Sequence, residues 1–136
     1  MMTSEYDPKL AYNRRFYEAQ QSGSSRSASI VVPLLLRYIA AQSVVDVGCG
    51  VGTWAAQFVA SGVKEVVGID GDYIDRSMLM IDAERFIPHN LNEPIRLSRQ
   101  FDLAVCLEVA ERAFDLLIFI EPPSKSELEF LTEAAA

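Results

Sequence analysis

The chain has 136 residues, half of them hydrophobic, which is enough for one domain with a buried core. Its formal net charge of −7 argues against a nucleic-acid-binding surface, because neutralising phosphates requires clustered lysine and arginine. No apolar run reaches the roughly 20 residues of a bilayer-spanning helix, and the polar start does not resemble a secretory leader. We therefore expect a cytoplasmic protein without membrane contacts.

Residues 1–25 form a polar lead-in. Within it, Tyr12, Phe16 and Tyr17 fit one side of a short helix over about Leu10–Ala19. This helix is expected to pack on the body of the domain.

A serine-rich stretch and an apolar stretch come next. Gln21–Ser29 contains five serines and a glycine, which predicts a loop ending in a helix cap. Ile30–Ala41 is strongly apolar and predicts a helix buried against a sheet. Pro33 fits this helix only in its first turn, where the missing N–H is no loss, so we expect the helix to begin near Ser29.

The most informative stretch is Val44–Trp54, where a β-branched run leads into three glycines at alternate positions. The pattern predicts a strand over Ser43–Val47, a tight turn and the start of a helix. Trp54 and Phe58, four residues apart, belong to an apolar stripe of that helix. Gly62 is expected to end it.

Asp46 lies just before the three glycines. A dinucleotide fingerprint puts a diphosphate at such a loop, whereas a carboxylate there repels phosphate and suits an ammonium group. The stretch Asp46–Gly52 resembles the first motif of the class I S-adenosylmethionine-dependent methyltransferases. The resemblance implies that Asp46 interacts with the methionine part of the cofactor, directly or through water. It also implies that the loop backbone wraps this part, at Gly48, Cys49, Gly50 and Gly52. The alternatives are an NAD-binding loop and a turn that is rich in glycine only for packing.

A second strand is predicted over Lys64–Asp70. Asp70, at its carboxyl end, stands where nucleoside-binding α/β domains accept hydrogen bonds from both ribose hydroxyls. NAD enzymes use the same device, so Asp70 does not choose between the two cofactors. The resemblance implies contacts with the adenine edge just after it, at Gly71, Asp72 and Tyr73.

Arg85–Pro88 predicts a third strand, and Asn90 and Leu91 follow it where related enzymes have Asp-Leu. The resemblance implies that the side chain of Asn90 accepts from the adenine amino group and that the Leu91 N–H reaches a ring nitrogen. His89 fits a surface or hydrogen-bonded position better than the role of a general base.

Phe101–Glu111 predicts a buried parallel strand beside the first one. It is similar to the fourth-strand motif of small-molecule methyltransferases, Leu-Glu-Val-Ala-Glu followed by His, which implies that Leu107 and Glu108 border the cofactor near its methyl group. Arg112 stands in place of that His. No catalytic residue is therefore assigned.

The chain has two cysteines and one histidine, which make a structural zinc site improbable. No metal is expected. Cys49 and Cys106 are expected to be reduced thiols, as is usual in the cytosol.

The sequence departs from the family after Arg112. Either Val109–Leu116 is a helix that leaves a stub of strand, or residues 114–120 form an edge strand. Ser126–Ala136 predicts a short capped helix. Family members usually continue through two more strands, so we expect an uncovered apolar sheet edge that would favour a homodimer.

Together these patterns predict a single three-layer α/β domain over residues 1–136. The expected fold is Rossmann-like, with a mainly parallel sheet, the first strand central and helices on both faces, incomplete relative to the seven-stranded methyltransferase fold. The expected function is methyl transfer from S-adenosyl-L-methionine to a small-molecule acceptor. An inactive cofactor-binding remnant or interaction module, and an NAD-binding domain, are the alternatives.

Overall fold

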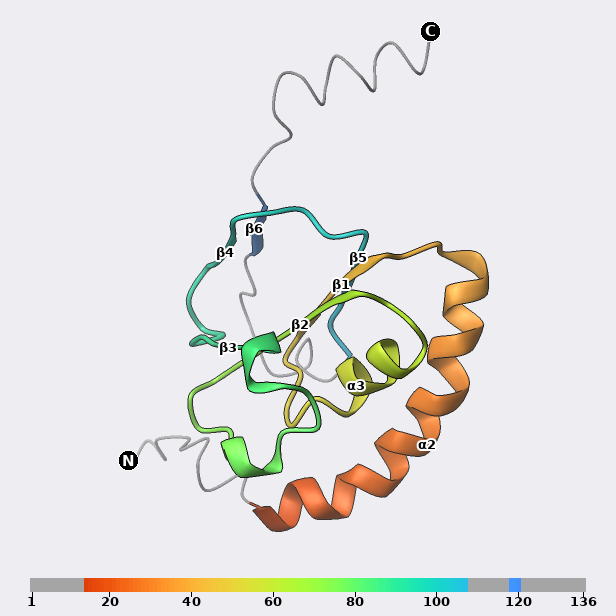
Figure 1. Cartoon of the computed structure of the whole chain (residues 1–136). Coiled ribbons are helices and arrows are strands. Elements are labelled where there is room, and N and C mark those ends of the chain that lie inside the picture. The colour runs from red at the N-terminus through yellow and green to blue at the C-terminus, as the bar shows by residue number, and fades with distance from the viewer. Residues whose placement is uncertain (1–13, 108–117, 121–136) are drawn as a thin grey trace, which may run out of the picture.

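The computed structural model describes residues 14–107 and 118–120 (Figure 1). Its elements in chain order are α2 (Arg14–Tyr38), β1 (Ser43–Val47), α3 (Thr53–Ala60), β2 (Glu65–Asp70), the 3₁₀ turns η1 (Arg76–Met78) and η2 (Ala83–Arg85), β3 (Phe86–Pro88), β4 (Ile95–Leu97), β5 (Leu103–Val105) and β6 (Ile118–Ile120). The expected strands at Ser43–Val47, Lys64–Asp70 and Arg85–Pro88 are thus confirmed, the latter two one residue shorter at the start.

The main sheet has four parallel strands in the order β3-β2-β1-β5. From β1 the chain moves outward through β2 to β3 and then returns to place β5 on the other side of β1. The direction of winding therefore reverses between β1 and β5, and a ligand crevice in such a sheet lies at the carboxyl ends of the strands at this point. The mainly parallel, Rossmann-like α/β fold is confirmed, with β1 inside the sheet.

Each face of the sheet has its own core. Val44 and Val66 project toward α2 and α3, where they pack with the buried Phe58. The neighbouring positions on the strands point to the opposite face, where Val45 and other residues pack against β4 through Ile95 and Leu97. Within residues 14–107, helices α2 and α3 cover one face and an extended segment covers the other, rather than helices on both.

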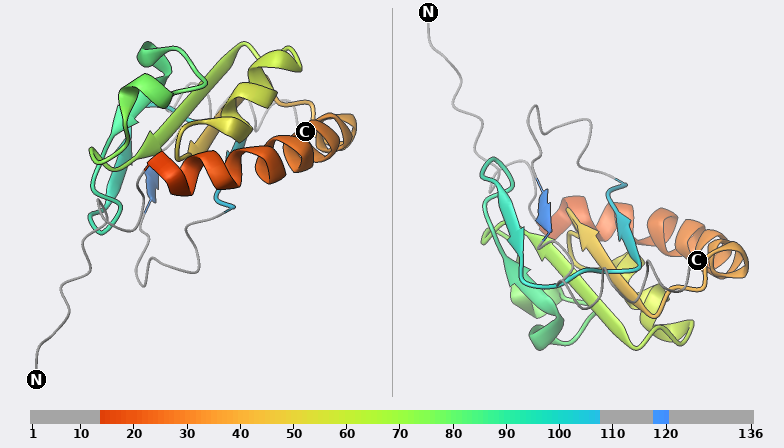
Figure 2. Two further views of the ribbon diagram at one scale, coloured as in Figure 1. Left: turned by 90° about the horizontal axis from the view of Figure 1, so that it is seen from below. Right: turned by 90° about the horizontal axis from the view of Figure 1, so that it is seen from above.

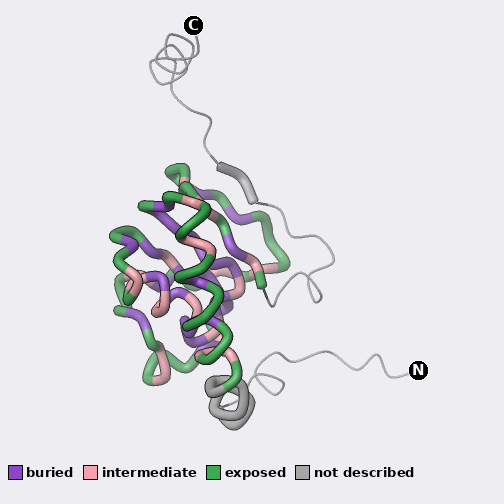
Figure 3. The backbone as a smooth tube through the Cα atoms, turned by 90° about the vertical axis from the view of Figure 1, so that its right-hand side faces the viewer, coloured by how far each residue is buried: buried purple, intermediate pink, exposed green. Residues whose placement is uncertain are grey.

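The N-terminal part contains one continuous helix, α2, where the sequence predicted two helices separated by a loop. It runs without interruption from Arg14 to Tyr38, so the predicted loop over Gln21–Ser29 and the helix start near Ser29 are wrong, and Pro33 lies in the helix interior. Ala28 and Val32 are buried four residues apart in the core that α3 shares. This tertiary packing outweighs the low helix propensity of serine and glycine. In Figure 2 the helix runs alongside the sheet, and Figure 3 shows how much of its surface is exposed.

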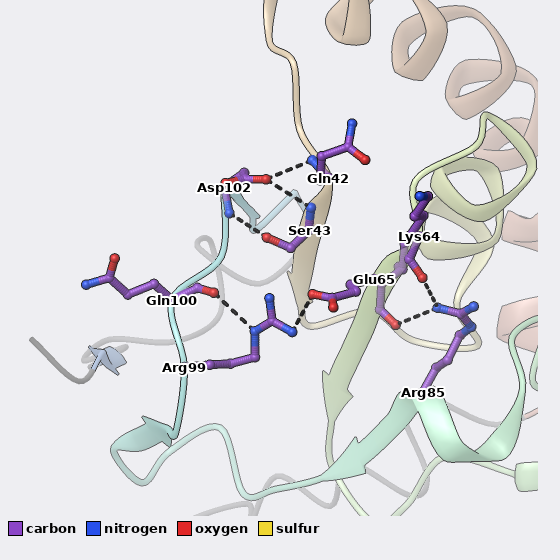
Figure 4. Close-up of polar contacts among 9 residues, drawn as sticks. Gln42, Ser43, Lys64, Glu65, Arg85, Arg99, Gln100 and Asp102 are labelled. Carbon is purple, nitrogen blue, oxygen red and sulfur yellow. Dashed lines mark hydrogen bonds and ion pairs between the residues drawn. The ribbon is translucent and has the colours of Figure 1, made fainter. Parts of the chain in front are cut away.

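The amino ends of β1 and β5 are joined by a side-chain clamp (Figure 4). The Asp102 carboxylate accepts hydrogen bonds from the N–H groups of Gln42 (2.8 Å) and Ser43 (3.2 Å), and the Ser43 hydroxyl accepts from the Asp102 N–H (2.9 Å). The bond from Gln42 is the main cause that lowers the pKa of Asp102. Nearby, Arg99 forms an ion pair with Glu65. These contacts fix an edge strand whose partner is distant in the sequence.

A second, two-stranded parallel sheet pairs β4 with β6, in the register Ile95 with Ile118. Both alternatives for the C-terminal part include a strand here, but its pairing with β4 was not expected. Residues 109–116, which distinguish the alternatives, lie outside the described residues, as do the helix predicted over Ser126–Ala136 and the start of that over Leu10–Ala19. The homodimer stays a prediction. No helix in the described part of the chain is long and apolar enough to cross a membrane.

Candidate functional site

The glycine-rich loop joins the carboxyl end of β1 to α3. Gly48, Gly50 and Gly52 have φ values of 78°, 56° and 87°, in the left-handed region that favours glycine. Gly52 is also the N-cap residue of α3, immediately before its first residue, Thr53. A Cβ atom added to Gly52 would lie 3.0 Å from Cγ1 of Ile81, so the Ile81 side chain leaves no room for a larger residue at this position. The loop conformation therefore requires glycine for both backbone and packing reasons.

The N–H groups of this loop are used by the protein itself. Those of Gly48 and Cys49 donate to the carbonyl of Ile69, at 2.7 and 3.2 Å, and that of Gly52 donates to the carbonyl of Cys49 at 2.9 Å. The Gly50 N–H donates to Oδ2 of Asp70 at 2.7 Å. Four amides that could otherwise cradle a phosphate thus bind β2 or the loop itself.

Asp70 is the centre of the polar contacts at this edge of the sheet. The residue is only 4% exposed. Oδ2 accepts from the Gly50 N–H, while Oδ1 accepts from the Gly71 N–H and from the Tyr73 hydroxyl, each at 2.7 Å. The carboxylate therefore joins the end of β2 to the glycine-rich loop in a fixed position.

Tyr73 covers the backbone just after β2. A Cβ atom built on Gly71 would overlap the Tyr73 ring, which shows that the ring lies directly against this glycine. The ring is half-buried in the core on the α3 side, and its hydroxyl reaches back to Asp70. Gly71 and Tyr73 are both among the positions predicted to meet the adenine edge, and the structure places the Tyr73 ring beside the Gly71 backbone.

Asp46 and Cys49 lie on the side of β1 that faces the helices. Asp46 is buried and sits between Gly68 of β2 and Val105 of β5 in the sheet register. Burial raises the pKa of the Cys49 thiol well above its usual range, and the charges of Asp46 and Asp70 raise it further. The thiol is therefore protonated and unsuited to act as a nucleophile. It donates to the carbonyl of Gly50 at 3.4 Å.

The segment after β3 approaches the same edge. The His89 N–H donates to the Asp70 carbonyl at 2.8 Å, which keeps the segment beside the end of β2. Oδ1 of Asn90 accepts from the Asn92 N–H at 3.0 Å, an Asx turn that fixes the side chain. Leu91 is half-buried against the core on the β4 side. The His89 ring makes its contact with the Glu93 carbonyl, at 3.3 Å.

The last predicted contacts follow β5. Leu107 is exposed at the carboxyl end of this strand, next to β1. Glu108, the second residue predicted to border the methyl group, lies outside the described residues, and so does Arg112. Among the described residues, the structure thus gathers every predicted contact on one edge of the sheet. In the same residues, no three His, Cys, Asp or Glu side chains are grouped to hold a metal ion.

Two residues that complete the site were not predicted from the sequence. A Cβ atom on Gly68 would lie 2.7 Å from Sγ of Cys49, so this glycine makes room for the loop. Ile81 packs below Gly52, and its neighbour Met80 donates its N–H to the carbonyl of Val51 at 2.8 Å. A glycine inside a strand is the local signal for such a close approach. Nothing local marks Ile81, because its partner is distant in the sequence.

Comparison with protein families finds a match over most of the chain. The family model described as "Methyltransferase domain" matches residues 11–121, which include all of the loops and strand ends above. Comparison with curated proteins finds no match.

Proposed function

The chain belongs to the methyltransferase-domain family, and we propose that it binds S-adenosyl-L-methionine and transfers the methyl group to a small-molecule acceptor. The observation that carries the proposal is the Asp70 carboxylate, which is buried at the carboxyl end of β2 and bonded to Gly50 of the glycine-rich loop. A fixed carboxylate at this place suits the two hydroxyl groups of a ribose.

The residues present fit the cofactor chemically. The loop between β1 and α3 has no Cβ atoms at three positions, so a ligand can approach its backbone. Asp46 and Asp70 provide negative charge for an ammonium group and acceptors for hydroxyl donors. We assign Asp46 and the loop to the methionine part, Asp70 to the ribose, and Asn90 with Leu91 to the adenine.

The same contacts argue against NAD. A diphosphate needs N–H donors from the loop, but those of Gly48, Cys49, Gly50 and Gly52 are bonded within the protein. The buried carboxylates of Asp46 and Asp70 would also repel a diphosphate. A cofactor with an ammonium group and a ribose is the better chemical match.

When bound, S-adenosyl-L-methionine supplies a methyl group activated by its sulfonium centre. The chain's own residues would contribute by holding the cofactor and acceptor in line, and such positioning can supply much of the rate enhancement. Leu107 and Glu108 are proposed to border the methyl group. We assign no general base.

Calorimetric titration with S-adenosylhomocysteine, in parallel with NAD, tests the proposal. Wild-type protein is expected to bind S-adenosylhomocysteine with micromolar affinity and to bind NAD far more weakly. Asp70→Asn keeps the size of the side chain but removes its charge, and should weaken binding by about tenfold or more.

Asp82→Asn is the matched control, because this carboxylate is not among the predicted contacts and its side chain is 87% exposed. It is expected to leave the affinity unchanged. Circular dichroism verifies that each variant is folded. A folded wild-type protein that does not bind S-adenosylhomocysteine would contradict the proposal.

Binding without turnover is the second candidate function. It is favoured by Arg112, which stands in place of the His of the similar methyltransferase motif. A methyl-transfer assay over a panel of oxygen, nitrogen and carbon acceptors separates the two. Product formation that is lost in Asp70→Asn would rule out the inactive module.

A further inference from the structure

The donors around Asp70 leave too few acceptor positions for a ribose. A carboxylate has about four lone-pair positions, two on each oxygen. In the described part of the chain, Gly71 N–H and the Tyr73 hydroxyl use both positions of Oδ1, and Gly50 N–H uses one position of Oδ2. The two hydroxyls of a ribose require two positions, so one of the three present donors must leave.

The Tyr73 hydroxyl is the donor that can leave. The N–H groups of Gly50 and Gly71 belong to the backbone of the glycine-rich loop and of the end of β2, and moving either would disturb the bonds of that loop to Ile69. The Tyr73 hydroxyl is on a side chain with rotatable bonds, and the residue is half-buried. It can move away without a change in the sheet.

We propose that Tyr73 and the cofactor ribose compete for the Asp70 carboxylate, so that Tyr73 lowers the affinity for S-adenosyl nucleosides. The inference rests on the proposed function and adds a residue that controls its cofactor affinity. The Tyr73 ring lies against Gly71, beside the predicted adenine contact. Binding of the ribose and loss of the hydrogen bond from the Tyr73 hydroxyl to Asp70 are thus one coupled step.

Tyr73→Phe is the most direct test, because it removes only the competing hydroxyl. Its dissociation constant for S-adenosylhomocysteine, measured by calorimetry, is expected to be roughly three- to tenfold lower than that of the wild type, which corresponds to one net hydrogen bond. Tyr73→Leu, which removes the hydroxyl and shortens the side chain, should show a gain of similar size. Tyr38→Phe on α2 is the matched control, because this tyrosine is 81% exposed and distant from Asp70 in the sequence.

A second ligand distinguishes competition from a general loosening of the site. The 2′,3′-dideoxy analogue of S-adenosylhomocysteine has no ribose hydroxyls to compete for Asp70. Tyr73→Phe is therefore expected to bind this analogue with the wild-type affinity. An equal gain for both ligands would overturn the proposal.

The outcomes separate this inference from the proposed function. If wild type and Tyr73→Phe both bind S-adenosylhomocysteine with equal affinity, or if the variant binds it more weakly, competition at Asp70 is refuted while cofactor binding stands. If both proteins are folded and neither binds, the methyltransferase proposal fails and the competition with it. Binding by Tyr73→Phe alone would support both.

Discussion

Both ends of the main sheet are organised by an aspartate that accepts backbone N–H groups, but the two aspartates differ in their surroundings. At the amino end, Asp102 is exposed and binds the backbone of Gln42 and Ser43. At the carboxyl end, Asp70 is buried and binds two backbone groups and the hydroxyl of Tyr73. Asp102 therefore serves only to join strands, whereas the proposed exchange of the Tyr73 hydroxyl would let Asp70 also receive a ligand.

The carboxyl end should be the more sensitive to added volume. Gly68→Ala puts a Cβ atom 2.7 Å from Sγ of Cys49 and 3.1 Å from Cδ1 of Ile81, both buried. We expect the free energy of unfolding to fall by about 3 kcal/mol, as for an overpacked core. Chemical denaturation measures it. Cys49→Ala in the same chain removes the Sγ atom and should restore part of the loss; no restoration would place the strain elsewhere.

Two further glycine-to-alanine substitutions separate the stability lost to backbone strain from the stability lost to tight packing. Gly52 and Gly62 both have positive φ values, 87° and 94°, but only the Cβ added at Gly52 meets a described neighbour, Ile81. Gly62→Ala is expected to lower the free energy of unfolding by about 1 kcal/mol through strain alone, and Gly52→Ala by about 2 kcal/mol. Equal losses in chemical denaturation would contradict the tight packing of the loop on Ile81.

A substitution at the amino end should destabilise the protein less than those at the carboxyl end, and the size of its effect should depend on pH. Hydrogen bonds from the backbone lower the pKa of Asp102, first of all that from Gln42, so the folded state favours the charged form. Its stabilisation is complete above the ordinary Asp pKa of about 3.9 and is lost as the pH falls below that value, through the lowered folded pKa. Asp102→Ala should therefore destabilise the protein at neutral pH, by a margin that shrinks in strong acid.

Asp72→Ala is the control for this pH dependence, because it removes a side chain that is 90% exposed. Urea denaturation of both variants and the wild type, at neutral pH and at about pH 2, makes the comparison. A loss for Asp102→Ala that stays the same at both pH values would show that its charge plays no part in the clamp.

The smallest expected change is a gain of stability from a substitution in helix α2, away from both ends of the sheet. Gly23 lies within α2, and a Cβ atom added there meets no described atom within 4 Å. Gly23→Ala should raise the free energy of unfolding by about 0.5–1 kcal/mol, because alanine loses less backbone entropy in a helix. Thermal denaturation measures this gain. A loss of stability would mean that the helix does not pass through this residue as described.

Patterns within a few residues predicted the parts of the fold that local chemistry controls. The β-branched run before Gly48 predicted β1, and the apolar stripe containing Phe58 predicted α3. The fourth strand was predicted over Phe101–Glu111, and β5 lies within that range, next to β1. These features depend on side-chain periodicity and turn chemistry, both of which can be seen in the sequence.

The remaining features depend on contacts between distant residues. The continuity of α2 through its serines requires the burial of Ala28 and Val32 against α3, which no local pattern encodes. The room that Gly68 leaves for Cys49 and the pairing of β4 with β6 likewise join separate segments. Asp70 was predicted as a ribose contact, but its bond to Tyr73 appears only in the folded structure.

The Asp102 clamp has a consequence for the order of folding. It joins Ser43 to a residue 59 positions later, so a long loop must close before β5 can dock beside β1. During synthesis, α2, β1, α3 and β2 leave the ribosome well before their last partner in the sheet. We expect the β5 side of β1 to be the last edge of the main sheet to be covered, and therefore the edge that a nascent chain exposes to chaperones for longest.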